Sequence, residues 1–309
     1  MRKLISTNGL SHEEWLRYRK QGIGGSDAGA ICGLNPYVSP MSVFYDKTNE
    51  EIETYDNESM RQGRDLEEYV ACRFVEETGL KVRRSNAIYQ NEKYPFMQAN
   101  VDRLISGKNM GLECKTASAY NADKWVGDSV PAHYEIQCHH YMAVTGAEAW
   151  YLAVLIMGRE FKYKRIERDE ELIRNLISIE QEFWEEHILT GNMPDPDGSE
   201  ISNEVINRYF PAAVKNSIPL PSSLNEQLKR REEIIHLAKK LEQEQNQIEQ
   251  KIKLFMGEYE EAFNEHYKVS WSNVDTVRID SKRLKEERPD LYRDFSKSSQ
   301  SRRLTIKAA

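Results

Sequence analysis

Two short segments carry residues that could do chemistry together. Asp102 lies in one predicted strand, and Glu113 and Lys115 lie in the next, after a predicted turn. Side chains two positions apart share one face of a strand, so Glu113 and Lys115 point the same way while Leu112 and Cys114 point into the core. The hairpin brings Asp102 alongside Glu113. Two carboxylates and one ammonium therefore converge.

This convergence is typical of a metal-dependent hydrolase. Two ionised carboxylates do not sit together without a cation. Hard oxygen ligands with few protein donors favour Mg²⁺, with Mn²⁺ as a substitute. A metal ion there would stabilise charge on a phosphate, and Lys115 would hold or deprotonate the attacking water, which suits phosphodiester hydrolysis. Taken alone, the same three residues also fit an exposed hairpin with a cross-strand salt bridge.

Two predicted helices supply further polar groups. Glu67 lies on the apolar face of a helix at 65–78, where a carboxylate needs a partner that a nearby metal site would provide. Gln137 lies on a helix at 134–144, and its amide could bind the nucleophilic water or a phosphate oxygen. The alternatives are a helix surface amide for Gln137, and a solvated residue or an ion pair with Arg64 for Glu67.

A glycine-rich turn near the start of the chain predicts an anion pocket. The turn at 22–25 leads into Ser26, which begins a helix of small residues, and Arg19 lies close by at the end of a predicted helix at 11–21. A helix start with an arginine beside it suits an anion. The alternative is a surface arginine and an ordinary N-cap serine.

Composition narrows the class of protein. The chain has 309 residues, 39% hydrophobic and 30% charged, which predicts roughly two domains. Its net charge of −7 argues against a simple basic nucleic-acid binder but not against a DNA enzyme, because the local field decides. Charge is uneven, with a net −6 over residues 159–200 and +4 over 275–309. The acidic helix face at 167–186 is expected to be solvated.

Targeting signals and a disulfide framework are not expected. No uncharged stretch approaches the ~20 residues that cross a bilayer, and the first residues lack the apolar segment of a signal peptide. The four cysteines form no CxxC pair and are expected to be reduced thiols. A membrane or secreted protein is therefore not predicted.

The order of predicted elements gives an α/β fold class, with a mixed central β-sheet flanked by helices. Proline and glycine at 193–198 end this core, so the predicted domains are 1–198 and a mostly helical extension at 199–309. The extension carries one long helix, at about 223–266, and a basic tail of short strands. Its apolar residues favour packing within the chain over partner binding. The strands of the core are predicted at 83–90, 95–105, 110–116, 149–156 and 161–166, and its last helix at 169–189.

Six ordered motifs within residues 11–190 carry a family resemblance. They are WLRYR at 15–19, IGGSDA at 23–28, GRDLE at 63–67, ANVD at 99–102, GLECKT at 111–116 and YEIQCHHY at 134–141. The chain resembles the YqaJ-like viral recombinase and phage lambda exonuclease family, within the PD-(D/E)xK nuclease superfamily. One departure is Val101, which stands where the family usually has proline.

The resemblance implies a restriction-endonuclease-like core and a 5′-to-3′ exonuclease on linear double-stranded DNA. Such an enzyme leaves 3′ single-stranded tails for recombination by strand annealing. It implies a homo-oligomeric ring, with a trimer favoured, and a single-strand annealing protein as partner. It also implies a phage or prophage protein in the cytoplasm of a bacterial host.

The resemblance also assigns roles to individual residues. The metal ligands would be Asp102 and Glu113 with support from Glu67, Lys115 would orient the nucleophile, Gln137 would assist, and Arg19 and Ser26 would bind the 5′-phosphate. Two alternatives stay open: a structure-specific or restriction-type endonuclease on the same fold, and a catalytically idle DNA-binding subunit. The anion pocket favours the exonuclease, because an endonuclease does not need to grip a terminus.

Overall fold

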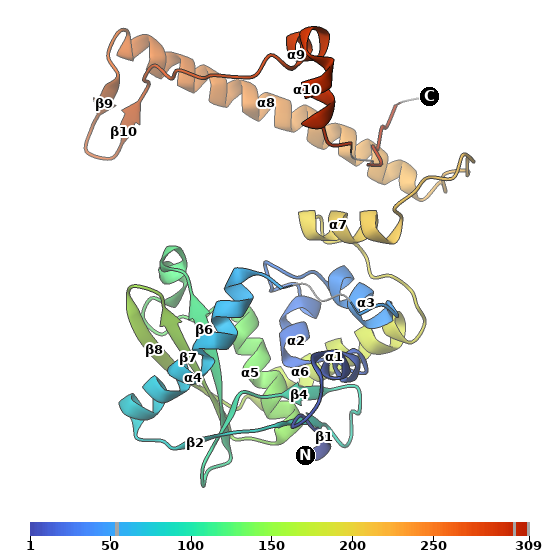
Figure 1. Cartoon of the computed structure of the whole chain (residues 1–309), viewed down its shortest axis with the longest axis vertical. Coiled ribbons are helices and arrows are strands. Elements are labelled where there is room, and N and C mark those ends of the chain that lie inside the picture. The colour runs from blue at the N-terminus through green and yellow to red at the C-terminus, as the bar shows by residue number, and fades with distance from the viewer. Residues whose placement is uncertain (53–55, 299–300, 308–309) are drawn as a thin grey trace. The chain divides into compact units, whose positions relative to one another are not determined.

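The computed structural model describes residues 1–52, 56–298 and 301–307. The chain forms two compact units, Met1–Pro211 and Ala212–Ala309, which are described separately as the first and second unit (Figure 1). Across the described ranges, no helix is both long enough and apolar enough to span a membrane.

The first unit is built on a five-stranded sheet. Its strand order is β2-β5-β6-β7-β8, in which only β6 and β7 run parallel. β7 is the most apolar strand of the sheet and is buried along most of its length, as expected for a strand covered on both faces. The prediction of a mixed central sheet is confirmed. The strands are β2 (Val82–Arg84), β5 (Arg103–Ile105), β6 (Met110–Ala117), β7 (Ala149–Ile156) and β8 (Glu160–Glu167).

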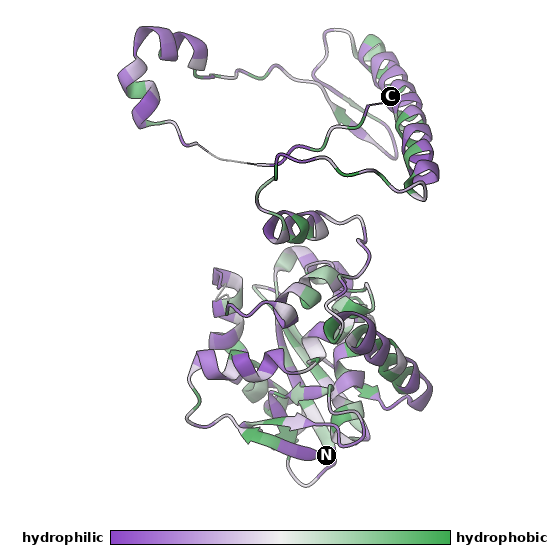
Figure 2. Ribbon diagram, turned by 90° about the vertical axis from the view of Figure 1, so that its right-hand side faces the viewer, coloured by the Kyte–Doolittle hydropathy of each residue, from purple (hydrophilic) through white to green (hydrophobic). Residues whose placement is uncertain are grey.

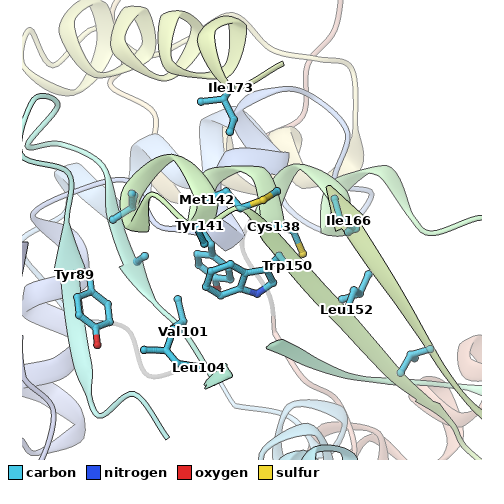
Figure 3. Close-up of a cluster of buried hydrophobic side chains, with 14 of the residues drawn as sticks. Tyr89, Val101, Leu104, Cys138, Tyr141, Met142, Trp150, Leu152, Ile166 and Ile173 are labelled. Atoms are coloured by element: carbon cyan, nitrogen blue, oxygen red, sulfur yellow. The ribbon is translucent and has the colours of Figure 1, made fainter. Parts of the chain in front are cut away.

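Helices cover both faces of this sheet (Figure 1). On one face, α4 (Glu58–Thr78) packs Phe74 and its neighbours against the alanines of β7. On the other face, α5 (Ala132–Thr145) packs Tyr141 against Trp150, with ring centroids 5.2 Å apart (Figure 3). Because side chains alternate along a strand, one face of β6 and β7 contacts α4 and the other face contacts α5.

A smaller antiparallel sheet joins β1 (Arg2–Ser6), β3 (Ala87–Gln90) and β4 (Gln98–Asn100). The strands expected at 83–90 and 95–105 are therefore each divided between the two sheets. The first division falls at Asn86, whose positive φ of 47° ends the extended backbone. The second falls at Val101 and Asp102, so Asp102 lies where the chain passes from one sheet to the other.

The remaining helices of the first unit surround these sheets. They are α1 (His12–Lys20), α2 (Gly25–Ile31), α3 (Pro40–Thr48), the 3₁₀ turn η1 (Ala119–Trp125), α6 (Glu170–Phe183), the π-helical turn η2 (Trp184–Ile188) and α7 (Glu200–Tyr209). The helix expected from residue 65 begins earlier, at Glu58, because Asn57 caps it by accepting a hydrogen bond from the Met60 amide.

The helical C-terminal region that the sequence predicts is present. The second unit consists of α8 (Leu224–Met256), the hairpin β9 (Glu261–Phe263) and β10 (Lys268–Ser270), α9 (Ser281–Glu287) and α10 (Pro289–Asp294). The long helix ends ten residues before the predicted position 266, because Gly257 adopts φ +56°. The prediction of short strands after residue 268 holds only for β10. The chain forms two short helices there instead.

Apolar residues recur along α8 (Figure 2), and most of the large ones are exposed. Ile234 is 51% exposed, Leu241 66% and Phe255 85%. Within the second unit, the described residues leave these side chains uncovered, so the predicted packing within the chain is not found there.

Candidate active site

Glu113 lies at the centre of the predicted site. It faces α5 from β6, and its side chain is only 4% exposed. Its Oε1 accepts one hydrogen bond from Lys115 Nζ and one from Gln137 Nε2, each at 2.6 Å. Its Oε2 is buried and has no hydrogen-bond partner among the described residues. Three of the residues singled out in the sequence thus meet at one carboxylate.

Asp102 lies beside them, in the short segment between β4 and β5. Arg103 pairs with Leu112 across β5 and β6, which places Asp102 next to Glu113 in the same register. Its Oδ2 accepts a hydrogen bond of 2.8 Å from the Cys114 amide. Burial, and then the charges of Glu113 and Glu67, raise the pKa of Asp102 well above its usual range. Two crowded carboxyls therefore occupy a buried site.

Glu67 has a partner that the sequence did not suggest. Arg103, 3% exposed, donates one hydrogen bond to Glu67 and a second, of 3.1 Å, to Glu68. The alternative pairing of Glu67 with Arg64 is wrong, because Arg64 binds Asp56 at 2.6 Å. A charged side chain in the otherwise apolar β5 is the signal that could have located this pair.

Lys115 and Gln137 are held by further contacts. Lys115 Nζ lies 4.8 Å from the ring centre of Tyr134. Burial disfavours the ammonium, but Glu113 and Asp102 outweigh it and raise the pKa of Lys115. Gln137 Nε2 also donates to the Tyr141 hydroxyl at 2.8 Å, so both of its acceptors fix the direction of the amide. We call Asp102, Glu113, Lys115 and Gln137 the carboxylate cluster.

The carboxylate cluster fits a divalent cation by its chemistry. Within the described ranges, no three His, Cys, Asp or Glu side chains are already arranged around a common metal position. However, Oε2 of Glu113 is buried without a hydrogen-bond partner, and the Asp102 carboxyl lies close to two other carboxyls. A divalent cation would compensate both. Carboxylate oxygens suit Mg²⁺ or Mn²⁺ better than a soft metal.

The two residues predicted to form an anion pocket, Arg19 and Ser26, lie in contact. Arg19 Nη2 donates to Ser26 Oγ at 3.1 Å, and the guanidinium stacks over Trp15 at 4.8 Å. The helix that carries Ser26 packs tightly on α5, since a Cβ on Gly25 would lie 2.5 Å from the Tyr141 ring. Ser26 and Gln137 therefore lie on two helices in direct contact, α2 and α5.

Two buried ion pairs escaped the sequence reasoning. Lys47 Nζ lies 2.8 Å from Asp27 Oδ2, and the lysine side chain is 1% exposed. His140 Nδ1 lies 2.8 Å from Glu180 Oε1, with both side chains fully buried. The expectation that 167–186 is a solvated face is therefore wrong at Glu180. Lysine and glutamate at helical positions carry no sequence signal that separates a buried pair from a solvated face.

Comparison with known proteins places the chain in a family. Residues 14–148 match the model of the YqaJ-like viral recombinase domain. The protein YqaJ of Bacillus subtilis (strain 168) is 38% identical over 308 residues, which cover 98% of this chain and 97% of that protein. The chain belongs to the YqaJ-like viral recombinase family. This confirms the predicted resemblance.

Two solved structures are similar to this YqaJ-like chain at low sequence identity. The alkaline exonuclease LHK-Exo of Laribacter hongkongensis has a TM-score of 0.50 and 19% identity, covering 65% of this chain and all of that one. A phage-related exonuclease of Haemophilus somnus 129PT has a TM-score of 0.43 and 13% identity, covering 58% of this chain and all of that one. The first match shows a common fold.

Proposed function

We propose that this protein is a metal-dependent deoxyribonuclease that degrades linear double-stranded DNA from its 5′ ends and leaves 3′ single-stranded tails. One observation carries the proposal: Glu113, with one oxygen bound by Lys115 and Gln137 and the other buried without a partner, stands beside Asp102. Membership of a viral recombinase family and the fold shared with an alkaline exonuclease support it.

The residues of the carboxylate cluster divide the work. Asp102 and Glu113 would hold the divalent ion, with Glu67 supporting them. When bound, the ion supplies charge neutralisation at the scissile phosphate and a more acidic water. The Lys115 ammonium orients the attacking water by donating a hydrogen bond to it, and the Gln137 amide steadies Glu113. The water oxygen bonds to phosphorus, the bond from phosphorus to the 3′ oxygen breaks, and that oxygen leaves with a proton as a hydroxyl.

Arg19 and Ser26 would select the DNA end. Guanidinium and hydroxyl donors suit the terminal 5′-phosphate. The cleavage leaves a new 5′-phosphate on the shortened strand, so the same pocket would bind again after each cycle. This repeated use is the feature that an endonuclease would not need.

The remaining parts of the proposal rest on family membership. We infer Mg²⁺ as the working ion with Mn²⁺ as a substitute, a ring-shaped homo-oligomer, with a trimer favoured, and a single-strand annealing protein as partner. The site of action would be the bacterial cytoplasm, with a core domain at 1–198 and an extension at 199–309.

Digestion of matched DNA substrates tests this function. Linear duplexes labelled at the 5′ or the 3′ end, and a covalently closed circle of the same sequence, are incubated with Mg²⁺ and the full-length protein. We expect the 5′ label to be released first and the circle to stay intact, with Glu113→Gln as the inactive control. Rapid cutting of the circle would favour the endonuclease alternative, and no cutting of any substrate would favour the idle subunit.

A further inference from the structure

The buried ion pair of Lys47 and Asp27 lies directly behind the anion pocket. Lys47 Nζ contacts three groups: Asp27 Oδ2 at 2.8 Å, the backbone carbonyl oxygen of Arg19 at 2.9 Å and, more distantly, the exposed Asp46 Oδ2 at 3.6 Å. Asp27 follows Ser26 in the chain, and its Oδ2 also accepts from the Gly24 amide at 2.9 Å. One lysine from α3 therefore touches both segments that form the pocket.

Asp27 is a potential competitor for the guanidinium of Arg19. Its side chain is 13% exposed, and burial would favour the neutral acid. The charges of Lys47 and then Arg19 outweigh burial and keep the pKa of Asp27 below its usual value, so the carboxylate is ionised. The ionised Asp27 carboxylate, close enough to Arg19 to interact with its charge, would bind the guanidinium if the Lys47 ammonium were absent.

We propose that Lys47 is a positioning residue for anion recognition: it neutralises Asp27 and anchors the Arg19 backbone, so that the Arg19 guanidinium stays directed to Ser26 and to a terminal phosphate. Without the ammonium, the Asp27 carboxylate takes the guanidinium for itself. The DNA end then loses a donor although Arg19 and Ser26 are both present. The inference rests on the proposed binding of a 5′-phosphate by these two residues.

The test measures binding and leaves catalysis out. Full-length protein is titrated, with Ca²⁺ in place of Mg²⁺, against a fluorescent duplex that carries either a 5′-phosphate or a 5′-hydroxyl. We expect the wild type to prefer the phosphate, and Lys47→Met to lose that preference by about tenfold, as for the loss of one charge-assisted hydrogen bond. The double variant Lys47→Met with Asp27→Asn removes the competitor and should recover most of the preference.

Lys20 provides a matched control. It follows Arg19 in the chain and also binds backbone carbonyls, those of Asn49 at 2.8 Å and Glu51 at 2.7 Å, without a contact to Asp27 in the described structure. Lys20→Met should therefore keep the wild-type preference. Equal loss in Lys20→Met and Lys47→Met would overturn the inference in favour of general weakening of α3.

The outcomes separate this inference from the function on which it rests. No preference in the wild type contradicts 5′-phosphate binding itself, and the inference with it. A wild-type preference that Lys47→Met retains contradicts only the inference. So does a double variant as impaired as Lys47→Met, because a packing role predicts no recovery. Should Lys47→Met fail to fold, the double variant is compared with the single variant Asp27→Asn. If the double variant loses the preference for the 5′-phosphate and Asp27→Asn keeps it, the inference is contradicted.

Discussion

The two units differ in how far they bury aromatic and charged side chains. The first unit fully buries Phe74 and Trp150 and also encloses charged side chains such as Glu113. In the second unit, Phe255 is 85% exposed, and Met256 is the sole buried residue among those described. Burying a charge is costly without a partner, so enclosed charges indicate a site rather than a packing solution. We therefore place the chemistry in the first unit.

Removal of one carboxylate from the cluster should have the largest effect. We expect Glu113→Gln or Asp102→Asn to slow DNA hydrolysis about ten-thousandfold, or ~5 kcal/mol, since charge stabilisation at the phosphate is lost. The thermal midpoint should stay level or rise, because repulsion between the two carboxyls is relieved. Initial rates on a labelled linear duplex and thermal unfolding measure the two effects.

An exposed carboxylate gives the control for that experiment. Glu148, which directly precedes β7, is exposed and in the described structure makes no side-chain hydrogen bond or ion pair with the site, and Glu148→Gln should keep the wild-type rate. Wild-type activity in Glu113→Gln would contradict a catalytic role for Glu113. An aggregated Asp102→Asn would instead indicate a structural role for Asp102.

A pair of phenylalanines tests the contrast between the units directly. Phe74→Ala should lower the free energy of unfolding by about 4 kcal/mol, because it leaves a cavity beneath α4. Phe255→Ala should change it by less than about 0.5 kcal/mol, because its side chain already contacts water. Denaturant titration of the full-length variants gives both values. Equal losses would show that the surface of α8 is covered in solution.

Arg19→Ala should have a smaller and more selective effect. We expect binding of a 5′-phosphorylated duplex to weaken by about tenfold, or ~1.4 kcal/mol, as one charge-assisted contact is lost. Binding of the 5′-hydroxyl duplex should change little. Anisotropy titrations of both duplexes test the difference, and an equal loss on both would reject a role for Arg19 at the terminus.

The pair of His140 and Glu180 should give the smallest effect, a pH dependence of stability. Burial raises the pKa of Glu180, while Glu180 raises the pKa of His140 in spite of its burial. The native state then binds more protons than the unfolded state, so stability falls as pH rises from about 4.5 through the histidine range. Denaturation from pH 5 to pH 8 should show a flatter profile for the double variant His140→Gln with Glu180→Gln. A wild-type profile that rises with pH relative to this variant contradicts the assignment.

Local patterns were enough to predict the elements that carry Glu113, Lys115 and Gln137, but not the break in the strand at Asp102. Alternation in β6 put Glu113 and Lys115 on one face, and the observed strand ends one residue beyond the predicted one. The helix that carries Gln137 was likewise found within two residues at each end. Both predictions succeed because short-range periodicity is tied to burial on one face.

Such local patterns do not predict which charged residues pair when they are far apart in the sequence. The apolar context of β5 signals a buried Arg103 but does not reveal Glu67 as its partner. Lys47 and Asp27 lie on separate helices, and each resembles a solvated charge in the sequence. The prediction that the apolar stripe of α8 packs within the chain was misled by a local pattern instead. Its spacing is that of a packed helix, but the described part of the second unit supplies no surface to cover it.

Metal binding by the carboxylate cluster is the claim that can be measured most directly. Mn²⁺ is titrated calorimetrically into the wild-type protein and into Asp102→Asn and Glu113→Gln, each checked for folding. The account predicts that Mn²⁺ binds the wild type and that each substitution weakens binding at least about tenfold. Wild-type protein that binds no Mn²⁺, or variants that bind it as tightly as the wild type, would contradict the account.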